Sequence, residues 1–148
     1  MPHFGLMDES AMPEDKAALL RAQLHLRGGR RRMHQEKYAA ALAALHDAVS
    51  SGMKWYILTL KEPLVIQAEE SVHLRTDREL FSSLAQAGVL DGMEDFDYFD
   101  DLLDQAFTGK VLSFNAGQVL SQVERWLSQL GVMPFDEGAL PPEDPETY

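Results

Sequence analysis

Residues 35–60 read QEKYAAALAALHDAVSSGMKWYILTL and carry the most regular apolar pattern in the chain. Large apolar side chains recur there every three or four residues, which is the repeat of one face of an α-helix. The stripe consists of Tyr38, Leu42, Leu45, Val49, Met53, Tyr56 and Leu60. Ser50, Ser51 and Gly52 are poor helix formers, but the repeat keeps its phase across them. The pattern therefore predicts one long helix whose small residues mark a close contact with another helix.

Residues 13–27, PEDKAALLRAQLHLR, predict a helix immediately before this one. Proline and two acidic residues at its start are typical of a helix N-terminus, and alanine and leucine then recur at helical spacing. Gly28 and Gly29 together cost about 2 kcal/mol against alanine inside a helix. We therefore expect the helix to end or weaken there, which makes RGGRRRMHQ, residues 27–35, a joint between two helices.

Three more segments are predicted to be helical and a fourth, residues 64–73, could be; together they complete an all-α fold. They are residues 64–73 after Pro63, 76–88 with a capping box of Thr76 and Glu79, 93–110 with the stripe Phe96, Phe99, Leu103 and Phe107, and 113–131. Glycines at the ends of the last three segments favour helix termination. We expect an antiparallel helical bundle of four to five helices, with two long N-terminal helices, short middle helices and a long closing helix.

The length of 148 residues suits one domain. Residues 1–12 have no apolar period and are expected to be a flexible N-terminus. Residues 13–131 are expected to form the bundle domain. Residues 132–148 are rich in proline and acid and contain no basic residue, so they predict an extended or disordered tail.

The net charge of −11 is unevenly distributed. Residues 1–61 carry nine Lys or Arg against six Asp or Glu, while residues 62–148 carry four against eighteen. An acidic protein repels phosphate backbones, which argues against nucleic acid as a partner. Cysteine is absent, and neither a secretory signal nor an apolar run long enough to span a bilayer is seen. We expect a soluble cytoplasmic protein with no membrane contact.

The arginines of residues 27–32 are expected to form ion pairs with carboxylates, and two acidic segments of the sequence could supply them. The first is the acidic cluster of residues 91–104, and the second is the tail; the pairing could lie within one chain or across a dimer. Tyr98 falls off the apolar stripe of its helix, so we expect it to be exposed and available to a protein partner. The predicted partner-binding residues are Asp97, Tyr98, Asp100 and Asp101.

The order of segments resembles a known family. The segments KAALLRAQLHL, KYAAALAALHDAVSSGMKWYIL, HLRTDRELFSSLAQAGVL and AGQVLSQVERWLSQL are similar to HEPN proteins (higher eukaryotes and prokaryotes nucleotide-binding) over residues 14–131. The resemblance implies a helical bundle that dimerises and can pair with a nucleotidyltransferase-type partner. It also implies possible RNA cleavage by an arginine and a histidine four to six positions apart in the closing helix. That helix supplies Arg125, but no histidine follows it.

Three sets of residues carry the alternatives to a binding module. Arg27 and His34 match the family spacing, with six residues between them, and would stabilise phosphorane charge and transfer protons in a ribonuclease. Arg30, Arg31 and Arg32 would bind a phosphate or nucleotide without chemistry. Glu70 and His73 form one E-x-x-H pair, whereas a two-metal bundle site needs two such pairs. An exposed acid and histidine are the favoured interpretation there, so we expect no metal and no cofactor.

Enzymatic activity stays open on the sequence alone, and a non-catalytic module is favoured. We expect a helical protein-interaction or adaptor module, homodimeric and HEPN-like. The rivals are a metal-independent HEPN-type ribonuclease and a nucleotide- or phosphate-binding protein using the Arg27–His34 segment.

Overall fold

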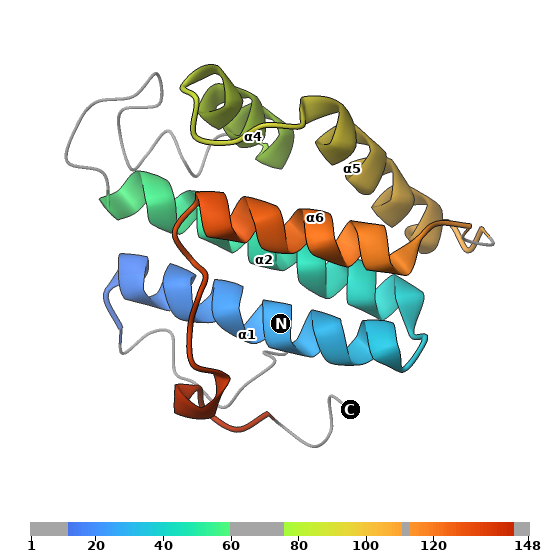
Figure 1. Cartoon of the computed structure of the whole chain (residues 1–148), viewed down its shortest axis with the longest axis horizontal. Helices are drawn as coiled ribbons and strands as arrows, with labels where there is room; N and C mark the ends of the chain where they lie inside the picture. The colour runs from blue at the N-terminus through green and yellow to red at the C-terminus, as the bar shows by residue number, and fades with distance from the viewer. Residues whose placement is uncertain (1–11, 60–75, 111–112, 144–148) are drawn as a thin grey trace.

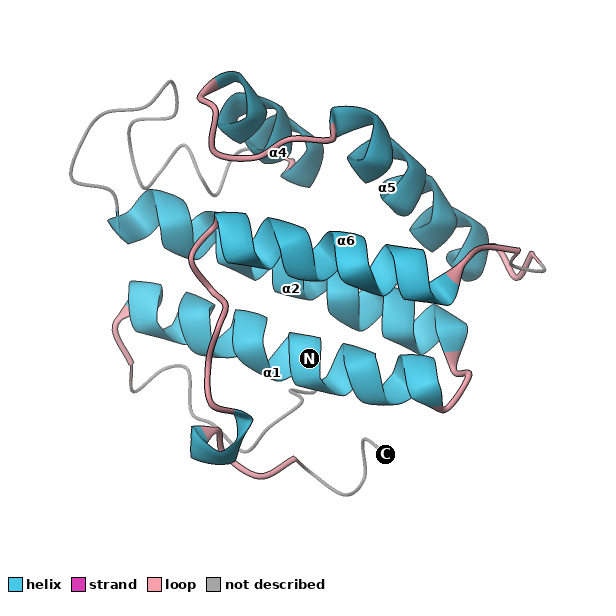
Figure 2. Ribbon diagram, in the orientation of Figure 1, coloured by secondary structure: helices cyan, strands magenta, loops and turns pink. Residues whose placement is uncertain are grey.

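A computed structural model describes residues 12–59, 76–110 and 113–143 of the chain (Figure 1). These residues form helices and no strand (Figure 2), which confirms the predicted all-α fold. The helices are α1 (Glu14–His34), α2 (Tyr38–Thr59), α4 (Asp77–Gln86), α5 (Met93–Phe107) and α6 (Ala116–Gln129), followed by the 3-10 turn η2 (Glu137–Ala139). The predicted helix 64–73 lies outside the described residues. No helix in the described ranges is long and apolar enough to cross a membrane.

Helix α1 does not end at its glycine pair, so the expected joint at residues 27–35 was wrong. The helix continues to His34, and the chain reverses over only Gln35, Glu36 and Lys37 before α2 begins. The reason is a tertiary contact, because a Cβ on Gly29 would lie 2.6 Å from Leu45 Cδ2 of α2. Packing against a neighbouring helix outweighs the intrinsic cost of glycine in a helix.

Helix α2 is the centre of the bundle, and its continuity through Ser50, Ser51 and Gly52 is confirmed. Helix α1 packs against it, and α4, α5 and α6 contact it as well. A Cβ on Gly52 would lie 3.2 Å from Leu127 Cδ2 and 3.3 Å from Leu130 Cδ1. The small residues therefore mark a close helix contact, as the sequence pattern predicted.

Four fully buried aromatic residues join α4, α5 and α6 above α2. Phe81 stacks on Phe96 at a centroid distance of 4.5 Å, and its edge meets Trp126 at 5.2 Å. Phe99 lies 5.9 Å from Trp126. Aromatic pairs of this geometry add about 0.5–1.5 kcal/mol each beyond burial. The cluster fixes where α5 and α6 lie relative to each other.

The predicted N-cap of α4 is confirmed. In α5, one residue of the predicted apolar stripe is exposed instead of buried. Thr76 Oγ1 accepts a hydrogen bond from the Glu79 backbone N–H at 3.2 Å, as expected for the N-cap of α4. Phe107, however, is 73% exposed. It lies in the last turn of α5. The helical repeat predicts which way a side chain points, but it does not predict whether a neighbouring helix is long enough to cover that side chain. Leu102, next to the predicted stripe, is buried instead.

The segment after α6 turns back across α1 rather than continuing away from the bundle (Figure 1). Val132 is buried in the core, and η2 follows a few residues later. The path brings the acidic residues of this segment to the arginine-rich half of α1. That placement decides which carboxylates the arginines contact.

Candidate functional site

The arginines of α1 pair with carboxylates of α6 and of the C-terminal segment. Arg30 Nε donates to Glu124 Oε1 at 3.1 Å, and its Nη1 donates to Glu137 Oε1 at 2.7 Å. Glu143 is ion-paired with Arg31. Arg27 Nη2 donates to the Pro141 carbonyl at 2.8 Å. These contacts correct the expectation that the acidic cluster of residues 91–104 would be the first partner, and they match the second source, the tail.

Arg30, Arg31 and Arg32 do not form one exposed phosphate-binding surface. Successive helix residues point about 100° apart, so three in a row spread around the helix. Arg32 is buried, and burial followed by the nearby charge of Arg31 lowers its pKa, although Glu143 opposes the shift. Arg30 and Arg31 hold carboxylates, as described above. These contacts join α1 to residues 137–143 of the same chain.

Arg27 and His34 both lie on α1, seven positions apart. The rise per residue separates them by about 10.5 Å along the helix axis. His34 Nδ1 donates to the Arg30 carbonyl at 2.8 Å, while Arg27 is turned to the C-terminal segment. Arg125, the arginine of the closing helix, is ion-paired with Asp91. No described arginine and histidine of this set converge on a common point.

Glu70 and His73 lie outside the described residues. Within the described ranges, no group of three or more histidine, aspartate or glutamate side chains is placed to hold a metal ion.

A polar network between α1 and α2 was not expected from the sequence. Arg21 donates to both oxygens of Asp47, at 2.9 and 2.6 Å, and Ser51 Oγ donates to Asp47 Oδ1 at 2.9 Å. The buried His25 places Nε2 at 3.7 Å from Asp47 Oδ2. Burial alone would raise the pKa of Asp47, but the hydrogen bonds from Arg21 and Ser51 and the charges of His25 and Arg21 lower it. The network holds the first two helices in register.

A second polar chain continues this network toward α4 and α5. Ser50 Oγ donates to Asp77 Oδ1 at 2.6 Å, and His46 Nε2 donates to Asp100 Oδ1 at 2.9 Å. The two networks line a cavity of about 560 Å³. The Ser50 proton points to a carboxylate and not to His46, so the geometry lacks the serine–histidine pair of a nucleophilic site. The groups connect helices without forming an activated nucleophile.

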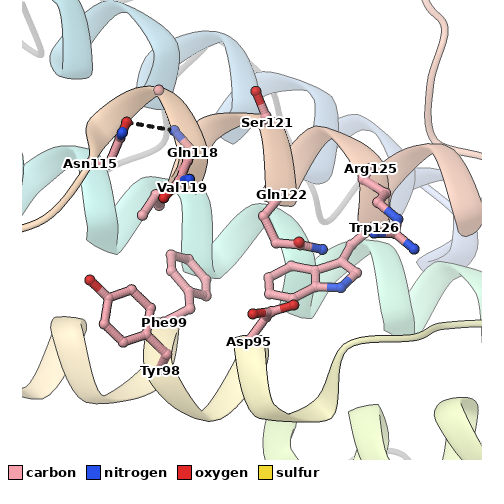
Figure 3. Close-up of a pocket in the computed structure, with 11 residues that line it drawn as sticks. Asp95, Tyr98, Phe99, Asn115, Gln118, Val119, Ser121, Gln122, Arg125 and Trp126 are labelled. Atoms are coloured by element: carbon pink, nitrogen blue, oxygen red, sulfur yellow. Dashed lines mark hydrogen bonds between the residues drawn. The ribbon is translucent and has the colours of Figure 1, made fainter.

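A groove of about 770 Å³ runs between α5 and α6 (Figure 3). Both helices pack on α2, and side chains fill the floor between them. Buried Phe99, Val119 and Trp126 form that floor, and Trp126 Nε1 donates to the Asp91 carbonyl at 2.9 Å. The volume falls in the range of small-molecule ligand sites, roughly 300–1,000 Å³. The groove is larger than the cavity of about 560 Å³ beside the polar networks, and it has an aromatic floor.

Tyr98 stands at the side of this groove with its ring toward α6 (Figure 3). Its side chain is 51% exposed, which confirms the predicted exposure. The other three predicted partner-binding residues make contacts within the chain: Asp97 accepts from Arg78 at 2.8 and 3.2 Å, Asp100 accepts from His46, and Asp101 accepts from Gln105. The hydrogen bond and charge of Asp97 raise the pKa of Arg78. Tyr98 alone of the four lines the groove.

The α6 side of the groove is polar and uncharged over most of its length. Gln118, Ser121 and Gln122 line it between the N-cap Asn115, which accepts from the Gln118 N–H at 3.0 Å, and Arg125 at the far end. The Gln122 side-chain nitrogen is buried and has no hydrogen-bond partner. Sequence reasoning missed these residues. Their signal was an exposed helix face carrying glutamine and serine where a solvated face usually carries charge.

Comparison of the chain with protein-family models, curated proteins and solved structures found no match.

Proposed function

We propose that this chain is a non-catalytic helical module that binds a protein partner in the groove between α5 and α6. The observation that carries the proposal is Tyr98, an exposed aromatic side chain beside a groove with a buried aromatic floor. Tyrosine is among the residues that supply most of the energy of protein interfaces, because it buries a large area at a small entropic cost. A groove between two helices is a common site for a partner helix.

No contact among the described residues favours the ribonuclease or the phosphate-binding alternative. The Arg27 and His34 side chains do not converge, and Arg30 and Arg31 hold carboxylates of the chain itself. Burial of Arg32 removes the third arginine from any shared phosphate site.

Assembly, family and location stay predictions. A homodimer and a cytoplasmic location were expected from the sequence, and the nucleotidyltransferase-type partner is implied only by the resemblance to HEPN proteins. Light scattering at low and high salt measures the oligomeric state directly. A dimer held by apolar faces persists at high salt, because salt weakens exposed ion pairs and not apolar contacts.

The test uses the two exposed large apolar side chains of α5 as a matched pair. Tyr98 lies in the groove, and Phe107 lies outside it on the same helix. A partner is captured on the tagged full chain, purified, and its affinity is measured by calorimetry. Tyr98→Ala is expected to weaken binding by roughly 30-fold, since an interface tyrosine contributes about 2 kcal/mol, while Phe107→Ala changes it little. Equal effects of the two variants, or no effect of Tyr98→Ala, contradict the proposal.

A further inference from the structure

The carboxylates of residues 91–104 fall into two groups by their contacts. Asp91, Asp97 and Asp100 are paired with Arg125, Arg78 and His46. In the described ranges the remaining four have no ion pair: Glu94, Asp95, Asp101 and Asp104. Carboxylates this close on one helix repel one another, so a cation brought near them is attracted.

One of the four carboxylates without an ion pair belongs to the groove. Asp95 lines it one helical turn before Tyr98, and Figure 3 shows the Asp95 carboxylate directed toward the α6 side. The site therefore places a negative charge next to an exposed aromatic ring and an apolar floor. A matching ligand carries apolar side chains for the floor and a cation for Asp95, which can also lie against the face of the tyrosine ring.

The dimensions of the groove indicate a helix of moderate length. The lining residues of α6 extend from Asn115 to Trp126, about 16 Å or three turns at the helical rise. The buried Gln122 amide nitrogen offers a donor without an acceptor. Leaving such a group unsatisfied is unfavourable, so a hydroxyl or a terminal carbonyl of the bound helix would satisfy it.

We infer that the partner segment of the α5–α6 groove is a basic amphipathic helix of about three turns. Its apolar stripe packs against the exposed ring of Tyr98 and the small exposed part of Val119, above the buried rings of Phe99 and Trp126, and lysine or arginine flanks that stripe toward α5. The inference rests on the proposed function and adds the chemistry of the partner. A second copy of this chain fits less well, because its net charge is also −11 and its α5 carboxylates would meet the same negative surface.

The experiment selects peptides on the intact chain. A display library of helical peptides of about 12 residues, with apolar positions constant and all others random, is enriched on the immobilised wild-type protein. The selected pool is sequenced for Lys and Arg against Asp and Glu. The best peptide is then measured by fluorescence anisotropy against wild type, Tyr98→Ala, Asp95→Asn and a control, Glu94→Gln, which removes a neighbouring carboxylate outside the groove lining.

The expected result is a pool enriched in Lys and Arg whose binding depends on Tyr98. Asp95→Asn is expected to weaken the best peptide about five-fold and Glu94→Gln less than about two-fold, and affinity falls as salt rises. Binding that depends on Tyr98 without basic enrichment overturns the inferred partner chemistry and leaves the groove function in place. Binding insensitive to Tyr98→Ala, or no enrichment, overturns both. A dimer in light scattering that Tyr98→Ala dissociates shows a second copy in the groove and also overturns the inference.

Discussion

The backbone of Gly29 lies directly against the side chain of Leu45, where α1 crosses α2. A Cβ atom at position 29 would fall 2.6 Å from Leu45 Cδ2 and 2.8 Å from Leu45 Cγ. Real Cβ contacts are longer than this, so only glycine permits the observed approach. The contact explains why α1 continues through a pair of residues that disfavour helices.

Gly29→Ala is therefore expected to destabilise the fold by about 1–3 kcal/mol, although alanine is the better helix former. Chemical denaturation gives the free energy of unfolding. Gly117→Ala is the control, because it lies in the exposed first turn of α6 and its Cβ would meet only Asn115 Oδ1 at 3.4 Å. That variant is expected to be neutral or slightly stabilising, and a stabilised Gly29→Ala protein contradicts the packing argument.

Asp47→Asn is expected to lower the free energy of unfolding by about 2 kcal/mol at pH 7, because it weakens a partly buried carboxylate that binds Arg21 and Ser51. Asp104→Asn, on an exposed residue with no ion pair in the described ranges, is the control and is expected to change stability little.

The effect of Asp47→Asn is also expected to depend on pH. The pKa of Asp47 is lowered in the folded protein. Its stabilisation is therefore complete above the unfolded-state pKa of about 3.9 and is lost as pH falls through the lower folded value. The difference between wild type and Asp47→Asn should stay constant from pH 7 to about 5 and shrink below about 4. A difference that grows with acid would contradict the assigned contacts.

Glu143→Gln is expected to loosen residues 136–143 from α1, because Glu143 is the more buried of the two carboxylates in this segment that bind arginines. Its side chain is 11% exposed, against 46% for Glu137. Hydrogen exchange of residues 136–143 should accelerate more in Glu143→Gln than in Glu137→Gln, since exposed pairs contribute only about 0–1 kcal/mol. Raising the salt concentration should narrow the gap between wild type and the variants. Equal exchange rates in all three proteins would show that these ion pairs do not hold residues 136–143 against α1.

His34→Ala and the wild-type protein are expected to behave alike toward structured RNA, with no cleavage above background by either. The reason is the separation of about 10.5 Å between Arg27 and His34 along α1 and the hydrogen bonds that both side chains make within the chain. Gel analysis of labelled RNA measures this. Cleavage by wild type that His34→Ala removes would restore the ribonuclease interpretation.

Local signals in the sequence predicted much of the helical structure. Thr76 is followed three positions later by Glu79, and this spacing predicted the start of α4 because a cap needs only its own first turn. The exposure of Tyr98 followed from its position off the α5 stripe. Phe107 shows the limit of the same reasoning, since periodicity gave its direction and could not show that its neighbours end before it.

The functional contacts required residues far apart in the chain. Glu137 lies 107 positions after Arg30, and the acidic cluster of residues 91–104 was the alternative, with seven carboxylates against five in residues 132–148. Charge counting cannot choose between two acidic segments, because the choice depends on the path of the chain after α6. The groove residues Gln118 and Gln122 were missed for a related reason. An uncharged exposed helix face is recognised as the side of a groove only when the position of α5 opposite it is known.

The sequence by itself determined the helical repeats, the cap of α4 and the exposure of Tyr98, because these depend on neighbours within one or two turns. The tertiary structure decided that α1 continues through Gly29 and that carboxylates of the C-terminal segment form the ion pairs with the α1 arginines. It also decided that Asp95 and Tyr98 face α6 across a groove. Each of these depends on the close approach of helices in three dimensions. Van der Waals contact and ion pairing act over a few ångströms, and only the fold brings distant residues within that range.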